Sequence, residues 1–191
     1  MAKEKMREKE NILDILVKSK YALAEKNVLL LKDLSNRTIH NASIYQDMDS
    51  ITIAVIVYAF YKILTRPDYE KYEDWPYFLK TVDSSLGKAI NDLEKDSMED
   101  FREDMQAIRK IVAKLSGNFK IYVDEVFRKA LISKASRIYE HGISMEKTAS
   151  LLGITLFELA EYTGRTGIAD VNLGITLDIE QRLKKAMEFF K

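Results

Sequence analysis

Residues 144–167, SMEKTASLLGITLFELAEYTGRTG, decide how the fold of this chain is interpreted. Ala149 has a small side chain that lets two helices approach closely, and Gly153 can adopt the left-handed backbone that a sharp turn between helices requires. Four apolar residues are placed to close the corner between the two helices: Leu152, Ile154, Leu159 and Tyr162. The spacing predicts a helix-turn-helix, in which a short turn joins two short helices.

Polar residues at the expected helix starts support this interpretation. Ser144 is suited to cap the first helix, and Glu146 places a carboxylate near the positive end of its dipole. Thr155 and Glu158 have the T-x-x-E spacing of a capping box at the start of the second helix. We expect Gly164 to end that helix. An ordinary helical hairpin within a core is the alternative that these residues leave open.

The charge of the second helix bears on what the motif binds. The second helix of a helix-turn-helix often enters the major groove of DNA, but here residues 155–163 contain Glu158 and Glu161 and no Lys or Arg. Affinity for DNA depends on cations that neutralise phosphates, and base edges are usually read by Arg, Lys, Asn or Gln. Cations that could hold phosphates from the flanks are Lys147, Arg165, Arg128, Lys129, Lys134 and Arg137. A protein-docking surface is the alternative.

A longer run around the motif, residues 134–171, has the sequence KASRIYEHGISMEKTASLLGITLFELAEYTGRTGIADV. It resembles the helix-turn-helix of small prokaryotic antitoxin-like proteins, and the stretch LDIEQRLKKAMEFF, residues 177–190, is similar to the tail of archaeal proteins with this module. The positions that carry the resemblance are Tyr139, Gly142, Ile143, Ser144, Ala149, Leu152, Gly153, Ile154, Thr155, Glu158, Gly167 and Ile168. The resemblance implies a transcriptional autoregulator or a partner of a toxin protein. No family is identified for residues 1–130.

Composition restricts the class of protein. The 191 residues include 30 Lys and Arg and 30 Asp and Glu, so the net charge is zero and any site for nucleic acid must be local. The absence of Cys excludes disulfides and thiolate metal sites. The N-terminal MAKEKMREKEN lacks the apolar core of a signal peptide, and the apolar run 51–61 is shorter than the roughly 20 residues that a bilayer requires. We expect a cytoplasmic protein with no membrane partner.

The chain has 2 Pro and 7 Gly and is rich in good helix formers, which predicts long helices. We expect helices over residues 2–34, 50–64, 75–95, 119–140 and 177–190, a further helix with Phe101, Met105 and Ile108 on one face, a loop or broken helix over 35–49, and a short extended stretch over 168–175. The helix over 50–64 is apolar nearly all round, so we expect it to be buried. Gly117 and Asn118 mark the expected boundary between two domains, 1–117 and 118–191.

Two groups of acidic residues are candidates for a metal site. His40, Asp47 and Asp49 could hold a divalent ion, but carboxylates directly before a helix usually cap it. Residues 92–103 imitate the spacing of a calcium-binding loop. Ser97 stands where such a loop needs Gly for its sharp turn, which favours a solvated acidic face. We therefore expect neither a metal nor a cofactor.

Little in the sequence indicates catalysis. It contains no P-loop, no G-x-G-x-x-G, G-x-S-x-G or H-E-x-x-H motif, and no Cys–His pair. Arg137 and His141 lie at helical spacing, closer together than the Arg and His of helical ribonucleases of the toxin class. His141 is expected to cap or pack at a helix end, where a cation is favoured. A helical nuclease around this pair, or a metal enzyme that uses His40, remains an alternative, and an enzyme is not favoured.

The sequence as a whole predicts an all-α fold, with a multi-helix N-terminal domain of unknown role followed by a helix-turn-helix module. We expect the module to bind double-stranded DNA in transcriptional regulation, in the manner of an antitoxin. The residues expected to contact DNA are Lys147, Thr155, Leu156, Phe157, Glu158, Glu161, Arg165 and Arg137. The alternative is an interaction protein whose motif docks a protein partner or a second copy of the chain.

Overall fold

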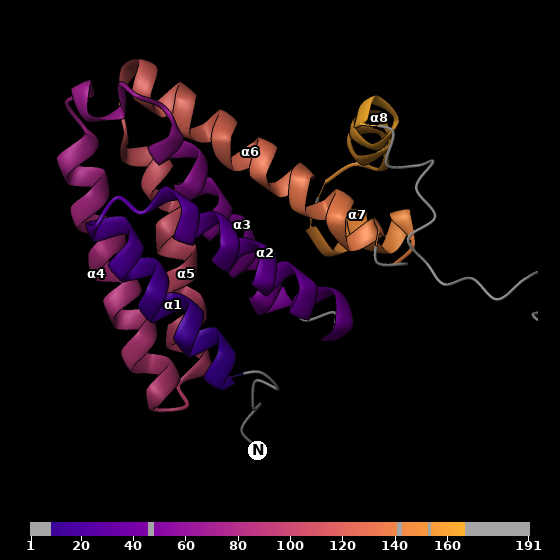
Figure 1. Cartoon of the computed structure of the whole chain (residues 1–191), viewed down its shortest axis with the longest axis horizontal. Helices are drawn as coiled ribbons and strands as arrows, with labels where there is room; N and C mark the ends of the chain where they lie inside the picture. Colours follow the sequence, from indigo (N-terminus) through magenta and orange to yellow (C-terminus); the bar gives the residue numbers. More distant parts are fainter. Residues whose placement is uncertain (1–8, 46–47, 141–142, 153, 167–191) are drawn as a thin grey trace, which may run out of the picture.

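The computed structural model describes residues 9–166, apart from 46–47, 141–142 and 153. Within these residues the chain is helical and contains no strand, which confirms the predicted all-α fold (Figure 1). The α-helices are α1 (Lys9–Ala24), α2 (Val28–Tyr45), α3 (Met48–Thr65), α4 (Trp75–Glu94), α5 (Met98–Lys110), α6 (Gly117–Glu140), α7 (Met145–Leu152) and α8 (Leu156–Thr166), and two short 3-10 helices are η1 (Tyr69–Lys71) and η2 (Ile111–Lys114). The elements expected over 168–175 and 177–190 lie outside the described residues.

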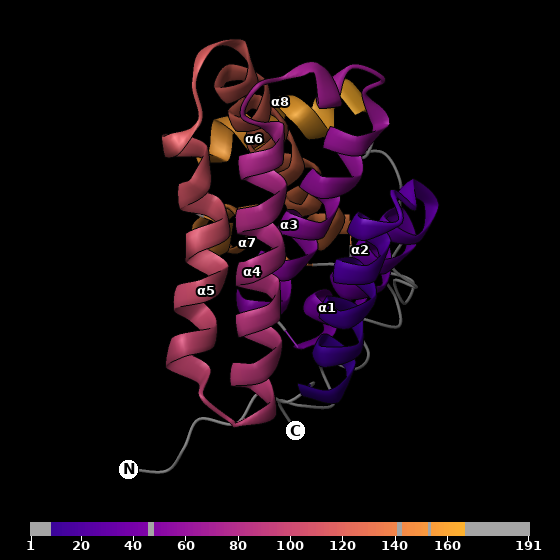
Figure 2. The same ribbon diagram turned by 90° about the vertical axis from the view of Figure 1, so that its left-hand side faces the viewer.

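Helix α3 occupies the centre of the bundle formed by α1 to α6. It packs against α1, α2, α5 and α6, and Figure 2 shows α4 and α5 side by side, with α1 and α2 to the right of α4. Because α3 is apolar over most of its surface, neighbouring helices can cover most of it, and its charged residues Asp49 and Lys62 lie near its two ends. Its buried apolar side chains are Ile51, Ile53, Ala54, Val55, Ile56, Val57, Ala59, Phe60, Ile63 and Leu64. This confirms the predicted buried helix.

The expected single helix over residues 2–34 is wrong, because the chain breaks between α1 and α2. Lys26 adopts a left-handed backbone with φ of 53°. The N–H of Asn27 donates to the carbonyl of Ala22 at 2.7 Å, and the N–H of Lys26 donates to the carbonyl of Leu23 at 3.2 Å. These two bonds form a Schellman stop, which usually uses Gly at the left-handed position. The Asn27 side chain then accepts from the N–H of Leu30 at 3.0 Å and so caps the start of α2.

Of the two alternatives expected over residues 35–49, a loop or a broken helix, the loop is wrong, since α2 continues to Tyr45 and α3 begins at Met48. Its polar side chains are compatible with a buried helix because they bond to helix carbonyls. The Ser35 hydroxyl donates to the carbonyl of Ala54 on α3 at 3.0 Å, and the Thr38 hydroxyl donates to that of Leu34 at 2.7 Å. Hydroxyls satisfied in this way can lie against α3 without the cost of an unpaired buried polar group.

Residues 92–103 do not form a calcium-binding loop, because they are the end of one helix and the start of the next. Asp92 belongs to α4, and Asp96 forms a second left-handed helix stop with φ of 58°. The N–H of Ser97 donates to the carbonyl of Asp92 at 2.8 Å. Burial, followed by a hydrogen bond with Asp92, raises the pKa of Asp104 on α5 to about 6. These two carboxyl groups lie on α4 and α5, within helices and not in a loop between them.

Helix α6 joins two apolar clusters. Phe119, Val123, Val126 and Ala130 in its first half belong to the main cluster with α1, α3, α4 and α5. The second half contributes Ala135 and Ile138 to a smaller cluster, which it shares with α2, α3, α7 and α8. Gly117, at φ of 51°, allows the chain to turn into α6. The division into domains 1–117 and 118–191 remains a prediction, and the first half of α6 packs with the residues that precede it.

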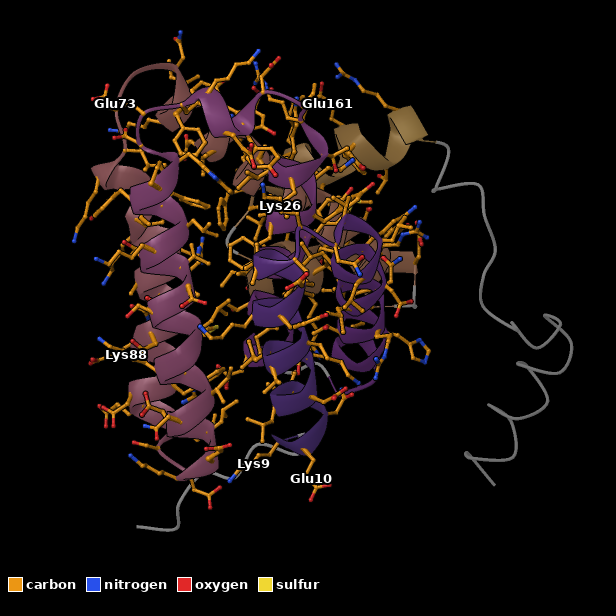
Figure 3. The ribbon with its side chains drawn as sticks, turned by 60° about the vertical axis from the view of Figure 1, so that its left-hand side comes forward. Lys9, Glu10, Lys26, Glu73, Lys88 and Glu161 are labelled. Atoms are coloured by element: carbon orange, nitrogen blue, oxygen red, sulfur yellow. The ribbon has the colours of Figure 1, made fainter. Side chains whose placement is uncertain are left out.

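Charges of both signs are spread over the surface. Figure 3 labels exposed side chains at separate places on it, among them Glu10, Lys26, Glu73, Lys88 and Glu161. Lys26 forms an ion pair with Glu70 across the top of the bundle. Among the described helices, none has the length and apolar character needed to span a bilayer.

Candidate functional site

The candidate functional site is formed by α7 and α8, which lie on the second half of α6. Both short helices pack against α6 and against each other. In Figure 1 α8 is seen nearly end-on while α6 runs across the picture, so these helices cross steeply. Ala149 is 4% exposed in the contact between the helices, and its carbonyl accepts from the N–H of Ile154 at 3.1 Å. A larger side chain at this position would force α7 away from its neighbours.

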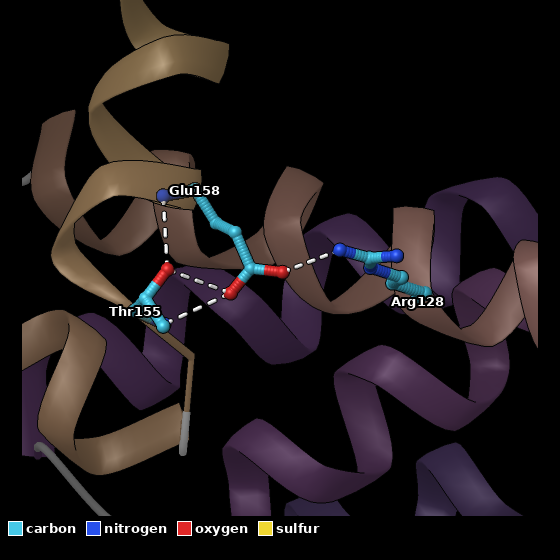
Figure 4. Close-up of polar contacts among 3 residues, drawn as sticks. All are labelled: Arg128, Thr155 and Glu158. Carbon is cyan, nitrogen blue, oxygen red and sulfur yellow. Dashed lines mark hydrogen bonds and ion pairs between the residues drawn. The ribbon is translucent and has the colours of Figure 1, made fainter.

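Both short helices have the caps that the sequence predicts. The Ser144 hydroxyl accepts from the N–H of Lys147 at 3.2 Å at the start of α7. At the start of α8 the Thr155 hydroxyl accepts from the N–H of Glu158 at 3.1 Å, and the Glu158 carboxylate accepts from the N–H of Thr155 at 3.0 Å (Figure 4). This reciprocal pair is a capping box. The expected stop at Gly164 is wrong, because α8 continues to Thr166.

The capping carboxylate also bonds to α6. Arg128 donates from Nη2 to Oε1 of Glu158 at 2.6 Å (Figure 4). The hydrogen bond from the Thr155 backbone, together with those from Arg128 and the Thr155 hydroxyl, lowers the pKa of Glu158 to about 2. Glu158 therefore stays ionised at neutral pH, and its charge is compensated by Arg128. Its role is to hold the start of α8 against α6.

Helix α8 has one buried face and one exposed face. Leu159 and Thr163 are buried against its neighbours. On the other side, at the start of α8, Leu156 is 48% exposed and Phe157 is 75% exposed. Burying the apolar surface of one such side chain is worth about 1.5–3 kcal/mol, so a binding partner would gain from covering it. Glu161 lies one turn after Phe157 and pairs with Arg165 at 2.6 Å.

Two of the cations expected to hold phosphates, Lys147 and Arg137, lie on the surface. Lys147 is exposed on α7. Arg137 is exposed on α6 and pairs with Glu140 at 2.8 Å. The structure thus brings Thr155, Glu158 and Arg128 together in one network, and it places Lys147 and Arg137 on the two helices that support α8. His141, the second member of the candidate nuclease pair, lies outside the described residues.

Lys134 is the exception among the flanking cations. Its side chain is buried on α6, so the expectation that it could hold a phosphate of bound DNA is wrong. A helix that packs against neighbours on several sides buries whatever its inner face carries, and position 134 lies on the inner face.

Sequence reasoning missed a groove beside α8. It has a volume of about 750 Å³ and runs between α3, α6 and α8. Its walls carry tyrosines, aliphatic side chains and charged groups: Tyr58, Lys62, Tyr122, Glu125, Val126, Arg128, Lys129, Ile132, Ser133, Glu158, Glu161, Tyr162 and Arg165. Lys129 pairs with Glu125 at 2.5 Å, so much of the charge at its rim is balanced. No local pattern could have revealed the groove, because its three helices are distant in the chain.

The proposed metal ligands do not assemble among the described residues. Asp49 is bonded by Arg102 of α5, whose Nη2 lies 2.9 Å from one carboxylate oxygen and whose Nε lies 3.1 Å from both. Asp47 lies outside the described part of the chain. Over that part, no three His, Cys, Asp or Glu side chains gather in a way that could hold a metal ion.

Comparison with known proteins does not assign this chain to a family. No family model, no curated protein and no solved structure matches this chain.

Proposed function

We propose that residues 117–166 bind double-stranded DNA, with the start of α8 inserted into the major groove. The observation that carries the proposal is the orientation of α8. Its Leu159 face is buried on α6 and α7, and its first residues, Leu156 and Phe157, are exposed. A recognition helix needs this disposition, because its N-terminal residues must reach base edges while the preceding helices support it from behind.

The charge of α8 is less adverse to DNA than its sequence suggests. Glu158 pairs with Arg128 and Glu161 pairs with Arg165, so each carboxylate of the helix has an arginine beside it. The phosphate backbone would meet a locally balanced surface in place of two uncompensated anions. Exposed ion pairs are weak, and Arg165 can exchange Glu161 for a phosphate at little cost.

The exposed side chains also indicate how bases would be read. Phe157 and Leu156 suit apolar contact with thymine methyl groups, which project into the major groove. Glu161 can accept a hydrogen bond from a cytosine amino group. Phosphate contacts would come from Lys147, Arg165 and Arg137. Three such contacts predict a logarithmic salt slope of about −3, which is shallow for a DNA-binding protein.

Titration of labelled duplexes with the full chain tests this proposal. The duplex set should include the DNA upstream of the protein's own gene, and binding should be measured by fluorescence anisotropy at low and moderate salt. We expect Phe157→Ala to weaken binding, whereas Leu29→Ala, which truncates a 79% exposed side chain on α2, leaves it unchanged. Lys147→Ala and Arg165→Ala should each reduce the salt slope by about one. Absence of binding at low salt and high micromolar protein would overturn the proposal.

Protein docking is the second candidate, and the exposed face of α8 favours one occupant, a second copy of this chain. Phe157, Glu161 and Gly164 lie on that face at successive turns. A side chain at Gly164 would meet no atom within 4 Å, so the space above it is open to a partner's Phe157. The Glu161–Arg165 pair is complementary to itself in an antiparallel contact. Sedimentation equilibrium should then show a dimer that Phe157→Ser disrupts, and a monomer at all concentrations would exclude this alternative.

A further inference from the structure

A second cleft lies between α1 and α2, away from α8. It has a volume of about 500 Å³ and is lined by Asn11 of α1 and by Asn36, Arg37 and His40 of α2. We refer to it as the α1–α2 cleft. Positions 36, 37 and 40 share one side of a helix, which explains why three side chains of α2 reach the same cleft. Each of the four side chains can donate hydrogen bonds, and arginine offers donors only.

A buried lysine lies behind this cleft. Lys134 of α6 is 2% exposed, and its Nζ donates to Oδ1 of Asn36 at 3.3 Å. The Lys134 Nζ also lies 4.3 Å from the centre of the Tyr58 ring. Since the oxygen of the Asn36 amide accepts from Lys134, the NH₂ group is the end of that amide that can donate to a ligand in the cleft. Asn36 therefore acts as a donor, and its orientation is set from inside the protein.

Among the described residues that line the cleft, the charged side chain is that of Arg37. Arg37 lies at the surface and Lys134 lies beneath. The carboxylate of Asp14 is 3.7 Å from the Arg37 guanidinium, and it is bonded more closely by Lys18 at 2.8 Å. Among the described residues, the carboxylates of Glu10, Asp14 and Asp33 do not line the cleft.

We propose that the α1–α2 cleft binds the phosphate group of a small molecule, with Asn36, Arg37 and His40 donating to its oxygens and Lys134 acting as a positioning residue for Asn36. A planar guanidinium beside amide and imidazole donors matches the several acceptor oxygens of a phosphate. The volume exceeds that of a bare phosphate and lies in the range of small-ligand sites, so an attached organic group can be accommodated. The cleft is separate from the residues proposed to contact DNA, so the two proposals are independent.

Proton NMR of the full chain provides the test, because the sequence has only two histidines, His40 and His141. His141→Gln identifies their imidazole resonances. The protein is titrated at fixed pH and ionic strength with inorganic phosphate in one series and with AMP in another. We expect the His40 resonance to shift and saturate, with a dissociation constant below about 10 mM in at least one series. Tighter binding of AMP would identify a phosphate carried by an organic group, and tighter binding of phosphate would identify the free anion.

Three variants separate a specific site from general attraction. Arg37→Gln should weaken binding by roughly tenfold or more, while Arg109→Gln, which removes an exposed arginine on α5, should leave it unchanged. Asn36→Asp places a carboxylate against both Lys134 and the ligand. We expect it to abolish phosphate binding while the melting temperature stays at or above that of the wild type. The proposal is overturned if the His40 resonance does not move, if its shift fails to saturate, or if Arg109→Gln weakens binding as much as Arg37→Gln.

Discussion

Replacing the buried Lys134 by Met should stabilise the protein at neutral pH. Lys134 is 2% exposed, and among the described groups its cation is held by the Asn36 amide and the Tyr58 ring, with no carboxylate bonded to it. Burial, and secondarily the neighbouring charge of Arg137, lowers its pKa from 10.5 to about 8. A cation that is buried without an ionic partner weakens the folded state, because the unfolded chain solvates it fully.

The size of this effect follows from the lowered pKa. A fall from 10.5 to about 8 corresponds to about 3 kcal/mol of preference for the neutral form, given 1.36 kcal/mol for each pKa unit. The Met variant keeps the length of the side chain but loses the contacts of the ammonium with Asn36 and Tyr58, which together are worth about 1–2 kcal/mol. We therefore expect Lys134→Met to raise the free energy of unfolding at pH 7 by about 1–2 kcal/mol.

The sign of the pH dependence gives a stricter test. The unfolded state binds the Lys134 proton more tightly than the folded state, so the penalty is complete below about pH 8 and disappears as the pH rises to about 10.5. Urea denaturation at pH 7 and pH 10 should show that the advantage of Lys134→Met shrinks at the higher pH. Lys129→Met, at an exposed position of the same helix, serves as the control and should change stability by less than about 0.5 kcal/mol at both pH values. A variant less stable than the wild type at pH 7, or a difference that does not depend on pH, would refute the reasoning.

Three further predictions concern packing and capping. Ala149→Leu should destabilise the protein by about 1–3 kcal/mol in urea melts, because the contact of α7 with its neighbours leaves no room, and an unchanged midpoint would place Ala149 outside a tight contact. Val55→Asp should abolish cooperative unfolding measured by circular dichroism, since it buries an unpaired charge in α3, and a folded variant would contradict the position of α3 in the core. Thr155→Ala should cost about 0.5–2 kcal/mol in the same urea melts through loss of the α8 cap. Ser150→Ala, at an exposed position of α7, is its control, and equal effects of the two substitutions would contradict the capping role.

The local features of the candidate site could be predicted because each depends on residues close in the chain. Ser144, Thr155 and Glu158 form their caps within one helical turn, and the small side chain of Ala149 fits a contact that its spacing from the turn anticipates. The burial of α3 could be predicted as well, since a helix that is apolar nearly all round has little polar surface to present to water.

The rest depends on tertiary contacts or on unusual local choices. The left-handed Lys26 ends α1 where Gly would have been the recognisable stop, and Ser35 and Thr38 make the second half of α2 look like a loop. The Arg128–Glu158 pair joins residues 30 positions apart. The bond between Lys134 and Asn36 spans 98 positions, so neither the burial of the lysine nor the cleft in front of it could be inferred from spacing.

Photocrosslinking from position 157 tests the central claim most directly, because it reports what covers the exposed start of α8. A benzophenone amino acid in place of Phe157 is irradiated with labelled duplex and the full chain, and the same substitution at Leu29 serves as the control. We predict crosslinks to DNA from position 157 and none from position 29. Crosslinks to a second protein chain, or equal yields of DNA crosslink from both positions, would contradict the proposal that α8 is a recognition helix.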